Sequence, residues 1–387
     1  MAPRVSIRPH LAHVPFDPDA FAALVDDFRS GRLERLAAPL PRPPKSLPAP
    51  PTDVRPDAVA RPRLERRGAA ALAAGKLALV VMNGGMATRF GQTAKGVFPI
   101  AEDAPDVSFL RVKIAQARAA ERAFGGAVPV VAMQSFATEA PTAQHLAALG
   151  DEAAGVETFL QSLLPRVRPD GTALCEVEGA GAWPDTVVYA APGHGDLLGR
   201  LRASGTLAAL RERGVEHVLV SNVDNLGATP DPAVFGAHLE AVERGAAMTV
   251  EVVARSEGDA GGCVAVHPIL DRPTIIEGFR LPPDTDLAAL PHFNTNTLWF
   301  TLDALDAEIP LDWFAVRKSI ALPDGETTEV VQFERLIGQA ADHLGAAFVT
   351  VDRAARFLPV KTREEWAARR DQLLAAARTA GLAVPTA

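Results

Sequence analysis

Cysteine is scarce in this chain of 387 residues, which contains only Cys175 and Cys263. Two cysteines cannot build a disulfide framework or a cysteine-rich zinc site. The opening residues, MAPRVSIRPH, lack the apolar core of a signal peptide. No apolar run reaches the length of a membrane span, because Lys76 interrupts the segment 69–82. We therefore expect a cytoplasmic protein that does not enter a membrane.

Positive charge is in deficit, since 39 Lys and Arg stand against 47 Asp and Glu and the formal net charge is −8. This balance argues against a general nucleic-acid binder and implies that local cations hold any anionic ligand. The chain also lacks the GK[ST] of a Walker loop and the GxGxxG of a Rossmann sheet, which disfavours a nicotinamide enzyme. No serine triad, catalytic cysteine or His-rich zinc spacing competes for an active site.

The stretch that organises the chain is LALVVMNGGMATRFGQTAKGVFPI, residues 77–100. Its first six residues are apolar and partly β-branched, as in a buried strand, and Gly84 and Gly85 then allow a sharp turn. The loop that follows carries Arg89 and Lys95. Such a loop suits a polyphosphate, because bare amides approach anionic oxygens closely and the cations neutralise them. An ordinary strand-to-helix turn is the alternative.

The N-terminal part of the chain has a different character. Apolar residues have helical spacing over 17–36, and prolines over 39–62 are so dense that an extended strap or linker is expected. We expect three units, which are an N-terminal helix and proline-rich strap (1–75), a catalytic domain (76–361) and a C-terminal helix (362–387).

Strands and helices alternate in the central region, and strands dominate after residue 245. This order predicts an α/β fold with a mixed, mostly parallel central sheet flanked by helices. Ligands of such sheets bind beyond the carboxyl ends of the strands. The expected strands are 77–82, 128–133, 217–221, 247–253, 262–267, 274–277 and 297–301, and the expected helices are 109–124, 140–149 and 197–213.

Polar residues follow two of these strands. Asn222, Asp224 and Asn225 come directly after the strand 217–221, where a carboxylate flanked by amides suits a magnesium ion that bridges phosphate oxygens. Asx residues also form turns, which is the alternative interpretation. The segment 134–138 follows the strand 128–133 and either contacts a base or caps the next helix.

Two more polar motifs are candidates for a site. In the loop PGHGD, residues 192–196, the glycines allow close approach of a ring or phosphate and His194 can donate to an anionic oxygen. The alternative is that Asp196 caps the helix that follows. The string FNTNT, residues 293–297, suits several sugar hydroxyls, although a polar β-turn has the same composition.

Taken with the glycine turn, the strings PGHGD, SNVDNLGAT, FNTNTLWF and RFLPVK resemble the UTP:glucose-1-phosphate uridylyltransferase (UDP-glucose pyrophosphorylase) family and its relatives, the UDP-N-acetylhexosamine pyrophosphorylases. The similarity runs from about Leu77 to Lys361. It implies a nucleotidyltransferase fold of the glycosyltransferase-A type. It also implies that UTP reacts with a sugar 1-phosphate, with glucose 1-phosphate as the expected substrate, to give a UDP-sugar and pyrophosphate. Magnesium would be the cofactor of this reaction.

The resemblance implies roles for individual residues as well. The loop after the first strand would hold the triphosphate, a glutamine and a glycine backbone would read uracil, and Asp224 would bind the metal. Carried over by position, Arg89, Lys95 and Lys361 are the catalytic cations, Gly84, Gly85 and Thr88 hold the triphosphate, Gln161 and Gly193 contact uracil, His194 and Asn222 contact phosphates, and Gly262, Glu277, Asn294 and Asn296 contact the sugar.

The chain departs from the family pattern at several positions. Ala87 replaces the second glycine of GGxGTR, Ala94 replaces a proline, and Leu197-Leu198 replaces a polar or aromatic pair. Arg89 resembles the acetylhexosamine branch, whereas GHGD and FNTN resemble the glucose branch. A UDP-N-acetylhexosamine or another UDP-sugar is therefore the alternative product.

Only 26 residues follow Lys361, and 366–380 is expected to form one helix. The C-terminal β-helix domain of the glucose branch has no room there, so we expect a monomer or small oligomer. A regulatory pseudoenzyme that binds a UDP-sugar is a further alternative. It would be expected to have lost Lys95, Asp224 or Lys361, and all three are present.

Overall fold

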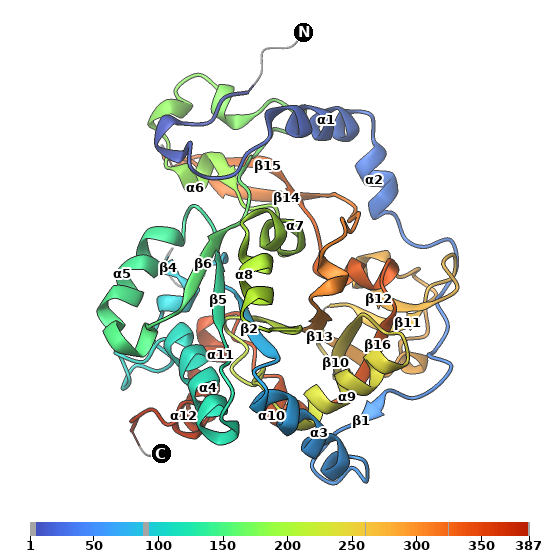
Figure 1. The fold of residues 1–387 in the computed structure, drawn as a ribbon. Helices are drawn as coiled ribbons and strands as arrows, with labels where there is room; N and C mark the ends of the chain where they lie inside the picture. Colours follow the sequence, from blue (N-terminus) through green and yellow to red (C-terminus); the bar gives the residue numbers. More distant parts are fainter. Residues whose placement is uncertain (1–4, 88–92, 260, 324, 386–387) are drawn as a thin grey trace.

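A computed structural model describes residues 5–87, 93–259, 261–323 and 325–385. Its largest element is a ten-stranded sheet in which most neighbours run parallel, as the sequence predicted, while β13 runs antiparallel to β9 and β10 (Figure 1). In spatial order the strands are β1 (Thr52–Asp53), β16 (Ala346–Thr350), β10 (Met248–Ala254), β13 (His292–Thr301), β9 (His217–Asn222), β2 (Leu77–Met82), β5 (Val130–Gln134) and β6 (Glu157–Leu160), with β11 (Cys263–Val266) and β12 (Pro273–Ile276) attached to β13.

Helices cover both faces of this sheet (Figure 1). None of the helices in the described ranges is both long enough and apolar enough to cross a membrane. They are α1 (Pro18–Arg29), α2 (Arg32–Ala37), α3 (Arg61–Ala73), α4 (Phe109–Phe124), α5 (Glu139–Leu149), α6 (Asp185–Val188), α7 (Asp196–Ala203), α8 (Thr206–Glu212), α9 (Pro232–Glu243), α10 (Arg353–Arg356), α11 (Arg363–Ala368) and α12 (Arg370–Thr379).

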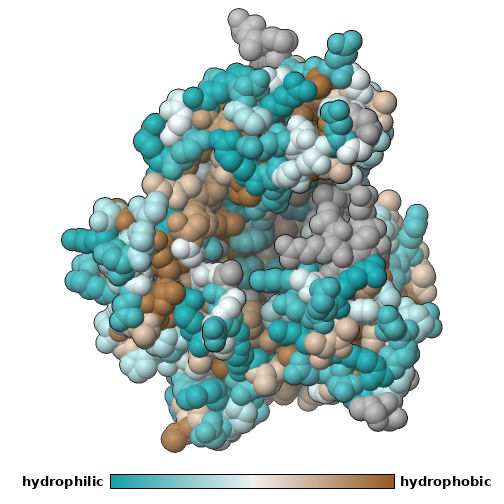
Figure 2. Space-filling model, turned by 180° about the vertical axis from the view of Figure 1, so that it is seen from behind, coloured by the Kyte–Doolittle hydropathy of each residue, from teal (hydrophilic) through white to brown (hydrophobic). Residues whose placement is uncertain are grey.

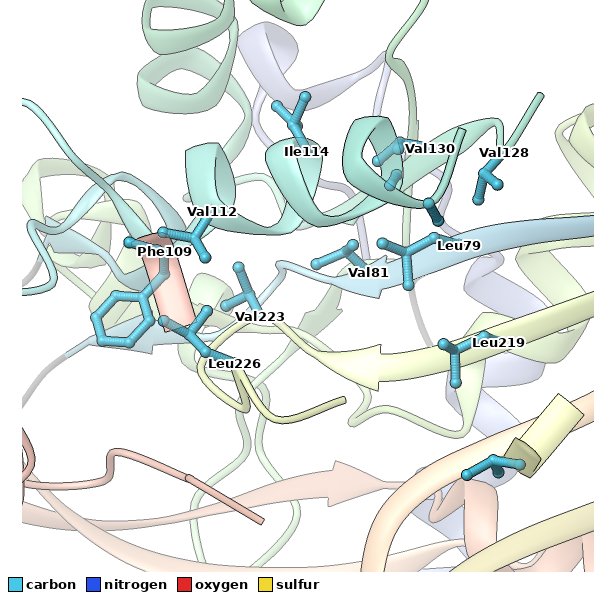
Figure 3. Packing of buried hydrophobic residues seen from close by; sticks show 14 of the residues in the cluster. Leu79, Val81, Phe109, Val112, Ile114, Val128, Val130, Leu219, Val223 and Leu226 are labelled. Carbon is cyan, nitrogen blue, oxygen red and sulfur yellow. The ribbon is translucent and has the colours of Figure 1, made fainter. Parts of the chain in front are cut away.

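The strand β2 lies at the centre and is buried along its whole length. Because successive side chains of a strand point to opposite faces, Leu79 and Val81 join the core under α4, whereas Val80 joins the core under α7 and α8. Figure 3 shows Leu79 and Val81 facing Val112 of α4. A fully apolar strand is what a sheet covered on both faces requires.

The carboxyl edge of the sheet gathers the loops that matter for function. Strand β2 pairs in parallel with β5 on one side and β9 on the other, so the chain order reverses at β2. Such a switch point opens a crevice beyond the strand ends. Because β13 is antiparallel, its first residues lie at this same edge.

A second, smaller lobe sits above this edge and is called the upper lobe (Figure 1). It combines α1, α2 and α6 with the hairpin of β14 (Phe314–Ala321) and β15 (Thr327–Glu334) and the pair β7 (Leu164–Pro165) and β8 (Tyr189–Ala190). Phe21 and Phe28 of α1 pack against Phe333 of β15. Seen from behind, the surface is hollowed between this lobe and the sheet (Figure 2).

The proline-rich strap runs from the upper lobe down the side of the sheet. The amide of Leu40 donates to the carbonyl of Arg280 at 2.8 Å, and β1 adds to the sheet in parallel with β16. The strap is therefore extended chain packed on the body, one of the two forms expected for it. A short edge strand tolerates the neighbouring prolines because few ladder bonds are needed there.

Three segments that were each expected to form one helix consist of two shorter helices. The segment 17–36 breaks at Gly31 and the segment 197–213 breaks at Gly205, and both glycines have positive φ angles, of 70° and 81°. The segment 366–380 divides at Arg369 between α11 and α12. Apolar periodicity survives such breaks because each half still buries one face, so spacing alone did not reveal them.

A polar β-turn was the alternative interpretation of the string FNTNT, and that alternative was wrong. Residues 293–297 lie inside β13, where they alternate between buried and partly exposed positions. The strand is irregular here, because its register with β10 shifts between Val250 and Val252 and Asn296 has a φ of 57°. The β14–β15 hairpin was not expected at all.

Candidate active site

The first glycine after β2 makes room for a side chain. The amide side chain of Gln161, at the end of β6, is buried against Gly84, and a Cβ on that glycine would lie 2.0 Å from Gln161 Nε2. The backbone N–H of Gln161 donates to Gln134 at the end of β5. Gly85 is different, since no described residue lies within 4 Å of a Cβ built there. Of the two glycines, only Gly84 is therefore packed against a described side chain.

Hydrogen bonds and close packing fix both ends of the glycine-rich loop. Asn83 is buried and donates from Nδ2 to Thr142 Oγ1 at 3.0 Å, while its Oδ1 lies against Gly96, where a Cβ would come within 2.0 Å. The loop is closed by a short ladder between β3 (Met86–Ala87) and β4 (Thr93–Ala94). The predicted residues Thr88 and Arg89 lie outside the described residues.

The chemistry of the candidate site centres on one ion pair. Lys95 Nζ lies 2.6 Å from Asp224 Oδ2, and both side chains are largely buried. The backbone N–H of Val360 donates to the same oxygen at 3.3 Å across 136 residues of sequence. Lys361 follows directly and is exposed, with its own N–H bonded to Glu365. The structure thus brings three predicted residues, Lys95, Asp224 and Lys361, into one neighbourhood.

The loop that carries Asp224 is fastened through Asn225, which the sequence marked as an amide beside Asp224 but to which no role was assigned. Asn225 Oδ1 accepts from the N–H of Leu358 at 2.9 Å, and its Nδ2 donates to Thr297 Oγ1 at 3.2 Å. The predicted residue Asn222 ends β9 and pairs with Met82 at the end of β2. These bonds join the ends of β9, β13 and the 358–361 segment beside the glycine-rich loop.

Helix α4 holds the other side of this loop. Lys113 is fully buried and donates to the carbonyl oxygens of Asn225 at 2.6 Å and Ala228 at 2.8 Å, while Gln116 donates to Leu226 at 2.7 Å. Burial, and to a lesser degree the charge of Arg356, lowers the pKa of Lys113 to about 7. Lys113 therefore holds the backbone of the loop that carries Asp224.

A buried ion pair supports the segment that leads to Lys361. Arg356 of α10 donates to both oxygens of Glu251 on β10, at 2.5 and 3.0 Å, and also to Thr229. Trp299 Nε1 completes the set by donating to Glu251 at 3.0 Å. Such a pair is costly to bury unless its remaining donors and acceptors are satisfied, as they are here by Thr229 and Trp299.

The PGHGD loop lies where the upper lobe joins the sheet. Gly193 has a φ of 75°, and a Cβ on it would come within 2.8 Å of the carbonyl oxygen of Arg335. The N–H of Ile337 donates to His194 Nδ1 at 3.0 Å, so the proton of the neutral ring is on Nε2. Burial lowers the pKa of His194, which favours that neutral form.

The structure does not support Asp196 as a cap of its own helix. Its side chain makes no capping bond to α7 and instead accepts from the N–H of Ser162 and from Arg335. The alternative interpretation of this loop as a simple helix start was therefore wrong. The partners of Asp196 are distant in sequence, so helix-start signals could not identify them.

Four residues assigned to the sugar lie together at the start of β11, the end of β12 and the first half of β13. The N–H of Asn294 donates to the carbonyl of Gly262 at 3.0 Å, and Asn294 Oδ1 accepts from the N–H of Asn296 at 2.9 Å. Both carboxylate oxygens of Glu277 lie within 3.6 Å of Cβ positions built on Gly262 and Gly338. Burial raises the pKa of Glu277. These positions form one polar wall.

The donor set at Asp224 suits a hard cation with few protein ligands. In the ranges that the structure describes, no group of three or more His, Cys, Asp or Glu residues could hold a metal ion. A magnesium ion, however, commonly uses one or two carboxylates and takes its other oxygens from water and phosphates. The two hydrogen bonds that reach Asp224 both fall on Oδ2. The site therefore fits magnesium brought with a nucleotide and does not fit a tightly held protein-only metal.

Sequence reasoning missed the residues that support the site, although one signal was present. In α4 the apolar face runs through Phe109, Ala117 and Ala120, and helical spacing places Lys113 and Gln116 on that same face. Two polar residues within a buried helical face indicate specific buried acceptors. No comparable local signal marked Arg335 or Arg356.

Comparison with known proteins gives consistent matches. A family model described as UTP–glucose-1-phosphate uridylyltransferase matches residues 49–379. The UTP–glucose-1-phosphate uridylyltransferase of Saccharomyces cerevisiae is 32% identical over 299 residues, which are 74% of this chain and 58% of the yeast protein. This chain therefore spans less than two thirds of that relative.

Solved structures agree in fold. A UDP-glucose phosphorylase from Trypanosoma brucei superposes with a TM-score of 0.75 at 22% identity, covering 94% of this chain and 77% of that one. A UDP-N-acetylglucosamine pyrophosphorylase from the same organism gives a TM-score of 0.70 at 21% identity, covering 91% and 75%. At these identities the likeness establishes the architecture alone.

Proposed function

This chain belongs to the UTP–glucose-1-phosphate uridylyltransferase family. From that premise we propose that it transfers the uridylyl group of UTP to a sugar 1-phosphate, with glucose 1-phosphate as the expected substrate, and releases pyrophosphate. One observation carries the proposal. Lys95 and Asp224, a phosphate-binding cation and a metal-binding carboxylate by position, meet at 2.6 Å at the carboxyl edge of the sheet, beside the backbone of Val360 and Lys361.

The reaction requires the protein to position the two substrates and to neutralise their charges. An oxygen of the sugar phosphate attacks the α-phosphorus of UTP, the bond from that phosphorus to the β-phosphate oxygen breaks, and pyrophosphate leaves. The attacking phosphate is already an anion at neutral pH, so no general base is needed. Lys95, Lys361 and Arg89 offset the repulsion between two polyanions in this proposal.

Magnesium is the proposed cofactor. Asp224 would hold it together with phosphate oxygens, and a bound magnesium ion supplies charge neutralisation at those oxygens. In the described residues Lys95 already neutralises the Asp224 carboxylate. The lysine and the metal would therefore be alternative partners of one side chain, and Lys95 would be free to contact phosphate once the nucleotide enters.

The substrate assignments come from the family resemblance. Gln161 and the backbone of Gly193 are proposed to read uracil, and the polar wall of Gly262, Glu277 and Asn294 is proposed to contact the sugar. A pocket shaped for one ring excludes the purine nucleotides. UDP-N-acetylhexosamine or another UDP-sugar is the alternative product, because the same fold occurs in a UDP-N-acetylglucosamine pyrophosphorylase.

A pyrophosphate-release panel tests the proposal. UTP, TTP, GTP, ATP and CTP are each paired with glucose, galactose, N-acetylglucosamine and glucuronic acid 1-phosphates in the presence of magnesium. We expect turnover to be fastest with UTP and glucose 1-phosphate. Equal rates with GTP or ATP would overturn the uracil assignment, and binding of UDP-glucose without any turnover would favour the regulatory pseudoenzyme.

We also propose a cytoplasmic monomer or small oligomer that binds neither nucleic acid nor membrane. The net charge of −8 supports the first exclusion, and both cysteines are free thiols, as a reducing compartment favours. Light scattering of the purified chain checks the oligomeric state. A large assembly that depends on α12 would contradict this part of the proposal.

A further inference from the structure

Asp196, in the PGHGD loop, is a buried carboxylate outside the proposed reacting centre. Its side chain is 1% exposed. Oδ2 accepts from the backbone N–H of Ser162 at 2.6 Å, and Oδ1 accepts from the guanidinium of Arg335 at 2.5 Å. The three residues come from three separate stretches of chain, so one carboxylate joins them all.

Backbone hydrogen bonds reinforce the same junction. The N–H of Gly195 donates to the carbonyl of Arg335 at 2.8 Å, and the N–H of Arg335 donates to the carbonyl of Pro192 at 2.8 Å. A Cβ on Gly195 would lie 2.7 Å from the backbone of Arg335. The guanidinium also stacks over Trp313 at 4.4 Å. The PGHGD loop and the strand exit at Arg335 are therefore packed backbone to backbone.

The position of this junction gives it a consequence for ligand binding. Ser162 follows Gln161 directly, and Gly193 is three residues before Asp196 in the same loop. Gln161 is itself pressed against Gly84 of the glycine-rich loop. A shift of either loop would thus change the distance between the two groups that are assigned to the base.

We propose that Asp196 is a positioning residue for the nucleotide base, which sets the spacing of Gln161 and Gly193 without touching the nucleotide. This inference rests on the proposed function, since it concerns discrimination among nucleotides. A buried carboxylate that faces two donors is suited to this task, because each donor is costly to leave unpaired. Its two donors come from the residue after Gln161 and from the exit of β15.

The variant Asp196→Asn tests the role with little change of shape. An amide offers one acceptor oxygen where the carboxylate offers two, so its NH₂ group must face either Ser162 N–H or Arg335 N–H. The base contacts should loosen as a result. UTP and CTP are the informative pair, because both are single rings and differ only in the donors and acceptors of the ring edge.

We expect the ratio of kcat/KM for UTP over CTP to fall at least about tenfold in Asp196→Asn, since small misplacements of binding groups commonly cost up to about a hundredfold. The loss should appear mainly as a higher KM for UTP. Calorimetric binding of UDP and CDP should show the same loss of preference without turnover. A merely structural role would lower stability and leave both ratios unchanged.

Asp231→Asn is the matched control. Asp231 is also a buried carboxylate that accepts backbone N–H groups, from Ala233 and Val234, and an arginine, Arg61. It caps α9, away from both base loops. We expect this variant to lower the thermal unfolding midpoint and to keep the wild-type preference for uracil.

Arg335→Met keeps the test decisive if Asp196→Asn fails to fold. It removes one partner of Asp196 and retains the bond to Ser162, so a smaller fall of the same ratio is expected. A wild-type preference for uracil that persists in the folded Asp196 or Arg335 variant overturns this inference alone. A wild-type protein with no preference for uracil in turnover or binding overturns the proposed function and this inference with it.

Discussion

Two lysines hold the loop after β9 from opposite sides, and they do so in different ways. Lys95 reaches Asp224 from the crevice side, where its side chain is 19% exposed. Lys113 reaches the carbonyls of Asn225 and Ala228 from α4 and has no exposed surface. One cation therefore pairs with a charge that a ligand can replace, and the other pairs with backbone that stays in place.

The difference shows how one loop can be both rigid and reactive. The Lys95–Asp224 pair is largely buried but keeps some exposed surface, so we expect that a metal or phosphate can reach it and replace one partner. A buried lysine bonded only to carbonyls is costly to remove, because it would leave those acceptors unpaired. We infer that function belongs to the Lys95 side of the loop and stability to the Lys113 side.

The largest expected effect is on the crevice side. Asp224→Ala should lower turnover by about a hundredfold to a thousandfold, because a preorganised charge at the reacting phosphates is lost. The unfolding midpoint should change by only a few degrees, since Lys95 can be solvated. Asp224→Asn, which keeps the shape, should be nearly as impaired, and wild-type turnover in either variant would refute the role of this carboxylate.

Lys361 offers a second test on the same side. Lys361→Met keeps the aliphatic stem and removes one exposed charge, and we expect turnover to fall about a hundredfold with normal stability. Lys318→Met is the control, because Lys318 is also exposed and pairs with Glu334 on the β14–β15 hairpin. If Lys361→Met resembles this control in turnover and UTP affinity, Lys361 is only a solvated surface residue.

On the Lys113 side of the loop, substitutions are expected to lower stability more than turnover. Lys113→Met should lower the free energy of unfolding by about 2 kcal/mol, because two buried carbonyls lose their donors. Gln116→Leu removes one such bond and should cost about half as much. Chemical denaturation measures both values. A large loss of turnover in Lys113→Met without a loss of stability would break the division between the two sides.

The smallest expected effect concerns pH. Burial lowers the pKa of Lys113 to about 7 from the ordinary lysine value of 10.5, so between these pH values the unfolded chain binds more protons than the folded one. This contribution to stability therefore increases as the pH rises from 7 towards 10. The stability difference between wild type and Lys113→Met should widen between pH 7 and pH 9. A constant difference would show that Lys113 stays protonated in the fold.

The sequence predicted the places of the site better than its connections. Strand ends and the glycine turn pointed to Gly85 and Asp224, since parallel strands deliver their carboxyl ends to one edge. Gln161 was expected only through the family resemblance. The resemblance assigned Lys95 to the triphosphate and Asp224 to the metal, but their direct contact was not predicted. The buried ion pairs of Asp196 with Arg335 and of Arg356 with Glu251 were not expected. In each pair the two residues are separated by more than a hundred residues of sequence.

Local errors had local causes. FNTNT has the polar composition of a turn, but the pairing of β13 with β9 and β10 keeps it in a strand. The β14–β15 hairpin has weak apolar alternation, because its exposed half is rich in charge. In each case tertiary contact overrode composition, as it commonly does for β structure.

By itself the sequence determined the fold class, the central strand and the loop chemistry, because these depend on periodicity, glycine and charge read over a few residues. The tertiary structure decided which polar groups meet. Asp196 joins Ser162 to Arg335, and Lys113 clamps the loop of Asp224, through bonds that span large sequence separations. Such partners are selected by packing, since a buried donor or acceptor must be satisfied by whatever group the fold brings within reach.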